Sequence, residues 1–117
     1  ETYILYLRTE GFLNEDRFAA AFARGKFRIK HWGRNRILAE LRSKKIKDSQ
    51  IRQSMGQIDE GEYFLALVDI LEKKSRTLKE TDAWKREQKL FTFAMQKGYE
   101  ADLIREAMKS LKSGENL

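Results

Sequence analysis

Hydrophobic residues recur every three or four positions along most of the chain, which is the spacing of one face of an α-helix. In the first half, the pattern is interrupted by glycine and by polar residues that favour helix caps. It predicts a short helix closed by Gly11, a helix N-capped by Asn14 that runs to about residue 30, and helices starting near Arg34 and near Asp48 or Ser49. The apolar stripe of the second of these is Phe18, Phe22, Gly25 and Ile29.

The second half repeats this alternation of helices and polar breaks. Tyr63, Phe64, Leu67, Ile70 and Leu71 mark a helix that runs to about Lys74 and is followed by a polar loop at 75–81. Thr81 or Asp82 is suited to cap the next helix, which carries Trp84 and Met95 in its apolar pattern and stops at Gly98. A last helix covers residues 103–111, and 113–117 are expected to form a tail.

Composition narrows the fold to all-α. The chain has 117 residues, no Pro, a single Val, and a predominance of Ala, Leu, Lys, Arg, Glu and Gln, which favours helices over strands. The absence of Cys excludes a disulfide framework and a thiolate metal site. The absence of Cys also fits a cytoplasmic protein. No apolar run approaches the roughly 20 residues that span a bilayer, so we expect no membrane partner.

An internal repeat supports the helical assignment. When the sequence is shifted by 53 positions, apolar residues superpose on apolar residues and one Arg superposes on another. The pairs are Ile37 with Leu90, Leu38 with Phe91, Leu41 with Ala94, Ile46 with Tyr99, Ile51 with Ile104, Arg52 with Arg105, Met55 with Met108 and Ile58 with Leu111. Such a period predicts tandem three-helix units that bury their apolar faces against neighbours, giving an elongated molecule.

Positive charge is concentrated between residues 24 and 47. The net charge is +6, and this stretch holds ten bases against one acid, Glu40. The ten bases are Arg24, Lys26, Arg28, Lys30, Arg34, Arg36, Arg42, Lys44, Lys45 and Lys47. Because apolar residues alternate with them at helical spacing, we interpret the stretch as a folded basic face for a polyanion or an acidic groove. Phe27 and Trp32 could stack on bases, but we expect them to be core or repeat-interface residues.

Few residues have the pattern of an enzyme site. His31 is the single histidine, so the chain has neither a His-pair metal site nor a Cys–His nucleophile. Gly25-Lys26 lacks the other residues of a phosphate-binding loop. The acid pairs Glu15-Asp16 and Asp59-Glu60 stand where helices are expected to begin, where the helix dipole explains them. We therefore expect a protein that is not an enzyme and needs no cofactor.

Several short motifs occur in an order that resembles the RecX family of recombination regulators. They are Gly11-Phe12-Leu13-Asn14-Glu15-Asp16-Arg17-Phe18-Ala19, Trp32-Gly33-Arg34-Asn35-Arg36-Ile37, Glu40-Leu41, Lys44-Lys45-Ile46, Lys89-Leu90, Gly98-Tyr99 and Ile104. The family has Gly where this chain has Lys45. A Lys there would carry a modest left-handed backbone cost, unless the turn has changed.

The resemblance implies a particular arrangement and function. It implies an elongated, curved array in which residues 1–12 are the third helix of a truncated first repeat, 13–58 the basic middle repeat and 59–112 the C-terminal repeat. It implies a monomer, without cofactor, that regulates the RecA recombinase in homologous recombination, DNA repair and the SOS response. The basic face would lodge in the groove of the RecA–DNA filament, bind DNA weakly through phosphates, and suppress strand exchange and co-protease activity.

An alternative is a stand-alone DNA-binding protein. In that interpretation the helix from Arg34 to Lys44 would be a recognition helix of helix-turn-helix type. The 53-residue repeat favours the first interpretation, because stacked units form a scaffold and do not single out one reading helix.

Overall fold

The computed structural model describes residues 12–115, with side chains described for residues 16–113. The regular secondary structure of that part is entirely α-helical, as predicted. The helices are α2 (Phe12–Lys30), α3 (Arg34–Ser43), α4 (Asp48–Met55), α5 (Glu60–Thr77), α6 (Ala83–Lys97) and α7 (Ala101–Glu115). The short helix predicted before Gly11, and with it nearly all of the segment 1–12, lies outside the described residues.

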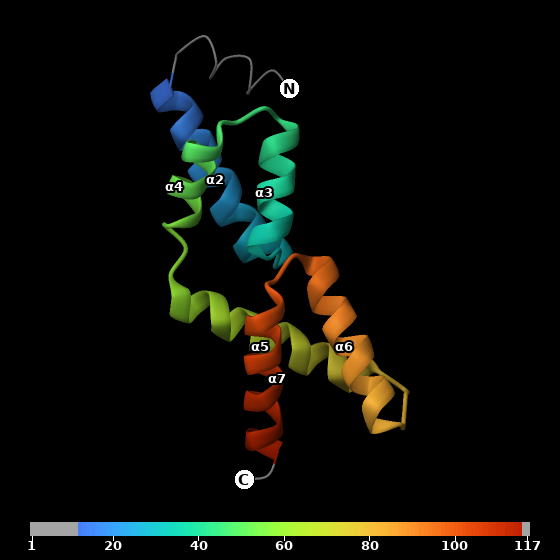
Figure 1. Ribbon diagram of the computed structural model, residues 1–117. Coiled ribbons are helices and arrows are strands. Elements are labelled where there is room, and N and C mark those ends of the chain that lie inside the picture. Colours follow the sequence, from blue (N-terminus) through green and yellow to red (C-terminus); the bar gives the residue numbers. More distant parts are fainter. Residues whose placement is uncertain (1–11, 116–117) are drawn as a thin grey trace.

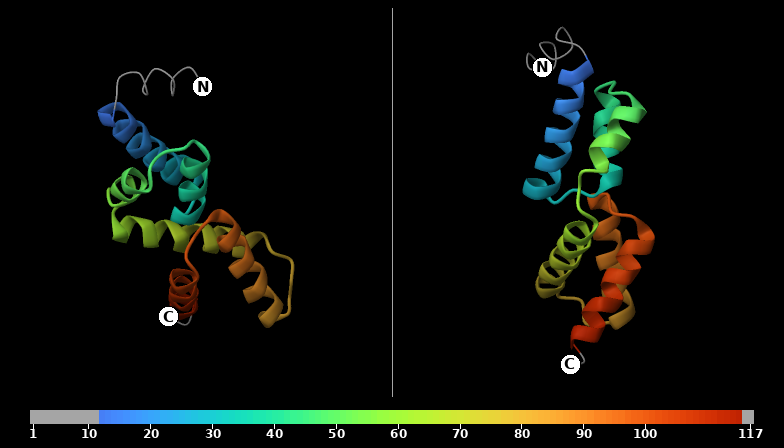
Figure 2. Two further views of the ribbon diagram at one scale, coloured as in Figure 1. Left: turned by 45° about the horizontal axis from the view of Figure 1, so that its top comes forward. Right: turned by 90° about the vertical axis from the view of Figure 1, so that its left-hand side faces the viewer.

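The helices gather into two bundles of three (Figure 1). In the first, α2 packs along α4 and beside α3, and in the second, α5 packs along α7 and beside α6. Figure 2 shows the bundles stacked end to end, and the molecule measures 54 × 23 × 20 Å. The elongated shape predicted from the repeat is therefore confirmed. We call α2–α4 the basic unit and α5–α7 the C-terminal unit.

The two units end their middle helices with the same backbone turn. After α3, Lys45 has a left-handed φ of 64°, and the Ile46 N–H donates to the Leu41 carbonyl over 3.1 Å. After α6, Gly98 has a φ of 102°, and the Tyr99 N–H donates to the Ala94 carbonyl, also over 3.1 Å. These are Schellman caps, and they lie 53 residues apart. The turn is thus kept in the basic unit although Lys replaces Gly.

The buried side of α2 differs from the predicted stripe. Ala19, Ala23 and Phe27 are buried, whereas Ile29 is 75% exposed, so the stripe through Ile29 was wrong. These three residues recur every four positions and form the buried row of α2, the helix that packs along α4, and Ile29 lies off this row. The predicted Asn14 N-cap is also wrong, because α2 already begins at Phe12.

Three further boundaries or faces differ from the sequence prediction. The loop expected at 75–81 is shorter, because α5 continues to Thr77 with support from Asp69–Lys73 and Glu72–Arg76 pairs one turn apart. Helix α7 continues to Glu115, so part of the expected tail is helical. Trp84 is 68% exposed in the first turn of α6, so it does not belong to the buried face.

One of the two caps predicted for α6 is confirmed, and a cap that was not predicted is found at the start of α5. The Asp82 carboxylate accepts a hydrogen bond from the Lys85 N–H at the start of α6, over 2.9 Å. Asp59 caps α5 in the same way, accepting from the Glu62 N–H over 2.9 Å. Within the described part of the chain, no helix is both long enough and apolar enough to span a bilayer.

Candidate interaction face of the basic unit

All ten bases of the predicted face lie in the basic unit, but the fold places them in different environments. Arg34, Arg28 and Arg42 pair with carboxylates. Lys26, Arg36 and Lys44 lie over aromatic rings. The others are exposed on the surface of α2 or in the turn between α3 and α4, and they are Arg24, Lys30, Lys45 and Lys47.

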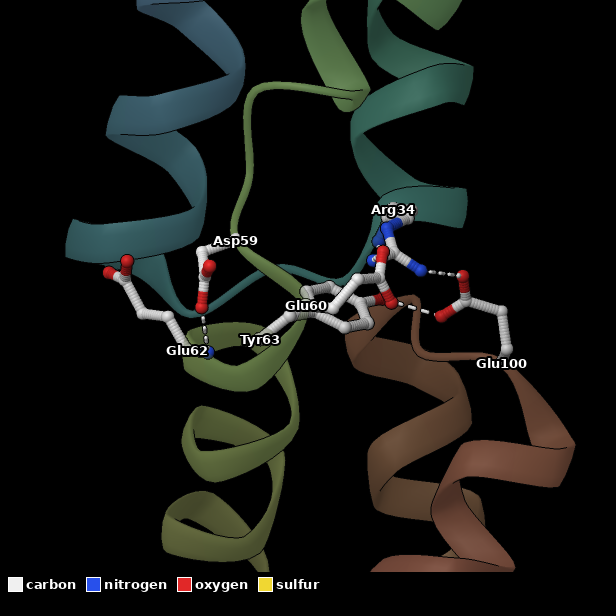
Figure 3. A network of polar contacts seen from close by, with 6 residues as sticks. All are labelled: Arg34, Asp59, Glu60, Glu62, Tyr63 and Glu100. Carbon is white, nitrogen blue, oxygen red and sulfur yellow. Dashed lines mark hydrogen bonds and ion pairs between the residues drawn. The ribbon is translucent and has the colours of Figure 1, made fainter.

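Arg34 belongs to the contact between the two units (Figure 3). Its guanidinium donates to Glu100 Oε2 over 3.0 Å and also pairs with the Glu60 carboxylate. The same group lies 3.9 Å from the centre of the Tyr63 ring, and only 20% of the side chain is exposed. Arg34 therefore holds the C-terminal unit and contributes little positive charge to the outer face.

Tyr63 completes this polar network. Its hydroxyl accepts from the Arg34 N–H over 2.9 Å and donates to Glu100 Oε1 over 2.5 Å. Burial raises the pKa of Tyr63 far above its ordinary value, and the hydrogen bond to Glu100 adds to the rise. The hydroxyl therefore keeps its proton and remains a donor to the carboxylate.

The backbones of the two units also meet directly at Gly33 and Gly98. The Gly33 N–H donates to the Lys97 carbonyl over 2.7 Å, and the Asn35 N–H donates to the Gly98 carbonyl over 2.9 Å. A Cβ at Gly33 would lie 2.3 Å from the Gly98 carbonyl carbon. Only glycine permits this approach. We call Gly33, Arg34, Tyr63, Gly98 and Glu100 the joint.

Aromatic rings fill the space beneath the joint. The ring of Tyr63 lies 5.0 Å from that of Tyr99 and 5.6 Å from that of Phe27, between ring centres. The Tyr99 hydroxyl donates to the His31 carbonyl over 3.2 Å, and burial, followed by the charge of Glu100, raises the pKa of this tyrosine. Phe27 is thus a core residue at the contact between units, as expected, and it does not offer a face to bases.

Two other arginines of the predicted face are paired on the surface. Arg28 pairs with Glu62 over 3.2 Å, and Arg42 pairs with Asp48 over 3.2 Å. All four side chains are about half exposed, so each pair contributes less than about 1 kcal/mol to stability. Their main effect is to place an opposing charge beside two of the ten bases.

A separate cluster of cations and aromatic rings lies where α2 meets α3. The Lys26 ammonium is 5.0 Å from the Trp32 ring centre and 5.4 Å from that of Phe22. The Arg36 guanidinium is 4.4 Å from the Trp32 ring, and the Lys44 ammonium is 5.6 Å from the Phe22 ring. We call these five residues the cation–aromatic cluster. No carboxylate pairs with Lys26 or Arg36 among the described residues.

Sequence reasoning did not assign Phe22 to the site. It was placed in the apolar stripe of α2, and it is half-buried. The spacing contained part of the signal, because Phe22 precedes Lys26 by four residues within α2, whereas Trp32 lies between α2 and α3. Residues four apart face each other on a helix, and an aromatic ring beside a cation at that spacing indicates a cation–π contact.

No three His, Asp or Glu side chains come together as a possible metal site in the described part of the chain. The candidate site of the basic unit is therefore a charged surface. It presents a basic surface that is neutralised at Arg28, Arg34 and Arg42 and supported by aromatic rings at Lys26 and Arg36. Such a surface is suited to bind an anionic partner.

Each of the two units matches a domain of the same protein family. The family description "RecX, second three-helix domain" matches residues 14–55, and "RecX, third three-helix domain" matches residues 61–108. The chain is 30% identical over 114 residues to "Regulatory protein RecX" of Clostridium perfringens, covering 96% of this chain and 53% of that protein. It is 32% identical over 107 residues to "Regulatory protein RecX" of Clostridium botulinum, covering 89% of this chain and 49% of that protein.

The chain thus spans about half the length of the curated relatives it matches. A "Regulatory protein RecX" of Clostridioides difficile is 24% identical over 111 residues, covering 95% of this chain and 52% of that protein. No solved structure matches.

Proposed function

Since both of its three-helix units match RecX domains, the chain belongs to the RecX family, and on this premise we propose that it regulates the RecA recombinase as an inhibitor. It would bind in the groove of the RecA–DNA filament and suppress strand exchange and co-protease activity. The observation that carries the proposal is the family match, which extends through both units. The relatives are named regulatory proteins, which agrees with a role that is not enzymatic.

The charge distribution supports contact through the basic unit. Residues 24–47 hold ten bases and one acid, and most of these side chains lie at the surface. A surface of this kind attracts a nucleoprotein filament, because each phosphate it neutralises releases condensed counterions. Binding to bare DNA through such contacts is expected to be weak at physiological salt and to fall steeply as salt rises.

The joint supports a filament-binding role in another way. It connects the units through backbone hydrogen bonds, a buried tyrosine and the ion pairs of Arg34, so that the two units act as one long body. A body 54 Å long offers an extended surface to a filament groove. The basic face would then be presented at a fixed angle to the C-terminal unit.

The fold speaks against the helix-turn-helix alternative. Recognition helices contact base edges with their N-terminal residues. In this chain the first residues of α3 form hydrogen bonds with the C-terminal unit. The Arg34 N–H donates to the Tyr63 hydroxyl, and the Asn35 N–H donates to the Gly98 carbonyl. The end of α3 that would read DNA is therefore packed against the C-terminal unit (Figure 1).

We test the proposal by reversing exposed charges that lie outside the joint. The triple variant Arg24→Glu, Arg36→Glu and Lys45→Glu should raise the concentration needed for half-inhibition of RecA-driven strand exchange by at least about tenfold, a change of about 1.4 kcal/mol in binding. Each reversal replaces attraction to a polyanion by repulsion. Helical circular dichroism should be unchanged, since all three side chains are exposed.

The matched control reverses three exposed lysines of the C-terminal unit, Lys79→Glu, Lys85→Glu and Lys109→Glu. The net charge changes by the same amount, so a purely global electrostatic effect would weaken both variants equally. The proposed contact requires the control to inhibit nearly as well as the unaltered chain. A wild-type chain that leaves strand exchange and filament assembly untouched at any concentration would refute the function itself.

A further inference from the structure

We propose that the cation–aromatic cluster of Phe22, Lys26, Trp32, Arg36 and Lys44 is a preformed site for the phosphodiester backbone of a nucleic acid strand. The inference rests on the proposed function and deepens it, because it selects part of the basic face as the place of contact. The remaining bases would contribute to the positive electrostatic potential around the site or stabilise the fold through ion pairs.

The first argument is the difference in how the cations are held. Arg28, Arg34 and Arg42 are each paired with a carboxylate, which cancels their charge toward a ligand. Lys26 and Arg36 are held by aromatic rings. A ring positions a cation through its quadrupole without neutralising it. These two groups are therefore oriented and still carry a full unit of charge.

The second argument is convergence from two helices. Lys26 projects from α2 and Arg36 from α3, yet both lie over the ring of Trp32, at 5.0 and 4.4 Å from its centre. One aromatic side chain therefore positions a cation from each helix. Because their rotamers are already restrained, a ligand that binds both loses less side-chain entropy than it would on mobile surface lysines.

The third argument concerns the ligand class. A phosphodiester strand offers charged oxygens at regular intervals, and it is suited to a compact ammonium beside a forked guanidinium. Trp32 is half-buried and has cations over its ring, so it acts as a support and does not serve as a platform for a base. The site should therefore bind strands with little regard to sequence.

Trp32 provides a direct reporter. The chain has two tryptophans, and the other, Trp84, is 68% exposed on α6 in the C-terminal unit. In a Trp84→Phe background, titration with an oligothymidylate should produce a saturating change in Trp32 emission. An oligothymidylate that binds, by anisotropy, without any change in Trp32 emission would overturn the site.

Salt dependence gives the second readout. Each phosphate contact to a single strand contributes about 0.7 to the slope of log affinity against log salt. Lys26→Gln with Arg36→Gln should therefore lower the slope by about 1.4. The matched control, Arg28→Gln with Arg42→Gln, removes the same charge from ion-paired positions and should lower the slope clearly less. Equal losses in the two variants would contradict the assignment.

Polyglutamate of the same charge as the oligothymidylate separates nucleic acid from an acidic protein surface. We expect it to bind at least tenfold more weakly at the same salt, and equal or tighter binding would overturn the phosphodiester assignment. An error in this site assignment can be distinguished experimentally from an error in the proposed function. If the Lys26→Gln/Arg36→Gln variant still inhibits RecA-driven strand exchange fully while the charge-reversed face does not, the function stands and this site is wrong.

Discussion

At the scale of single residues, Lys45 takes a conformation that its side chain disfavours. It has a left-handed φ of 64° in the cap that ends α3, where the equivalent cap after α6 uses Gly98. The left-handed region costs an L-residue with a Cβ roughly 1–2 kcal/mol. The same residue adds a positive charge to the basic face. Lys45 therefore combines a backbone cost in stability with a gain in surface charge.

We therefore expect Lys45→Gly to stabilise the chain by about 1 kcal/mol, since glycine removes the Cβ clash in the left-handed turn. Thermal unfolding followed by circular dichroism should show a rise in Tm of about 4 °C. Lys45→Ala is the control, because it removes the same charge and keeps the Cβ. If Lys45→Ala stabilises the chain as much as Lys45→Gly, charge repulsion is responsible and the backbone is not strained.

At the scale of elements, the end of α5 depends on one arginine from the next helix. Arg86 donates from Nη1 to the Leu78 and Glu80 carbonyls and from Nη2 to the Ser75 carbonyl and hydroxyl, over 2.7 to 3.3 Å. These bonds satisfy groups at the C-terminus of α5 and in the loop that follows. They explain why α5 continues past the polar residues where the sequence suggested a loop.

Replacing Arg86 by Ala should leave the carbonyls of this half-buried region without a donor and cost about 1–3 kcal/mol. Urea unfolding measures the loss, and hydrogen exchange should locate it at residues 75–78. Lys85→Ala, at an exposed neighbouring position, should change the free energy of unfolding by less than about 0.5 kcal/mol. A loss of the same size in both variants would mean that Arg86 does not hold this end of α5.

Helix periodicity and capping residues were enough to predict the number of helices in the described part and several of their ends, among them the start of α3 and both ends of α6. They could not give the face of α2, because Ala19 and Ala23 are weak signals of burial and Ile29 is a strong one. They also could not show which of the ten bases form ion pairs with carboxylates and which do not. The partners of Arg28 and Arg34, Glu62 and Glu100, are distant in sequence and meet them only through the packing of the two units.

At the scale of the whole molecule, the joint decides how the two units are oriented. Gly33 and Gly98 bring the backbones into contact, and the hydrogen bonds of Tyr63 and the ion pairs of Arg34 surround that contact. The 53-residue repeat predicted two stacked units. It gave no sign of the joint, because the joint arises from residues that belong to different units.

Gly33→Ala should therefore open the joint, since its methyl group would overlap the Gly98 carbonyl. We expect a loss of at least about 2 kcal/mol from overpacking, a larger radius of gyration in small-angle X-ray scattering, and weaker inhibition of RecA. Gly25→Ala is the matched control, because a Cβ there meets no atom within 4 Å. It should be neutral or stabilise α2 by about 0.5–1 kcal/mol. Unchanged scattering for Gly33→Ala would contradict this account of the joint.

The central claim is that this chain lies in the groove of a RecA–DNA filament with its basic unit toward the filament. Electron cryo-microscopy of the chain bound to RecA filaments on single-stranded DNA tests it most directly. We predict added density along the groove, shaped as two stacked three-helix units, with α2 and α3 facing the filament interior. Density at the filament's outer surface, or with the C-terminal unit inward and the basic unit toward solvent, would contradict the claim.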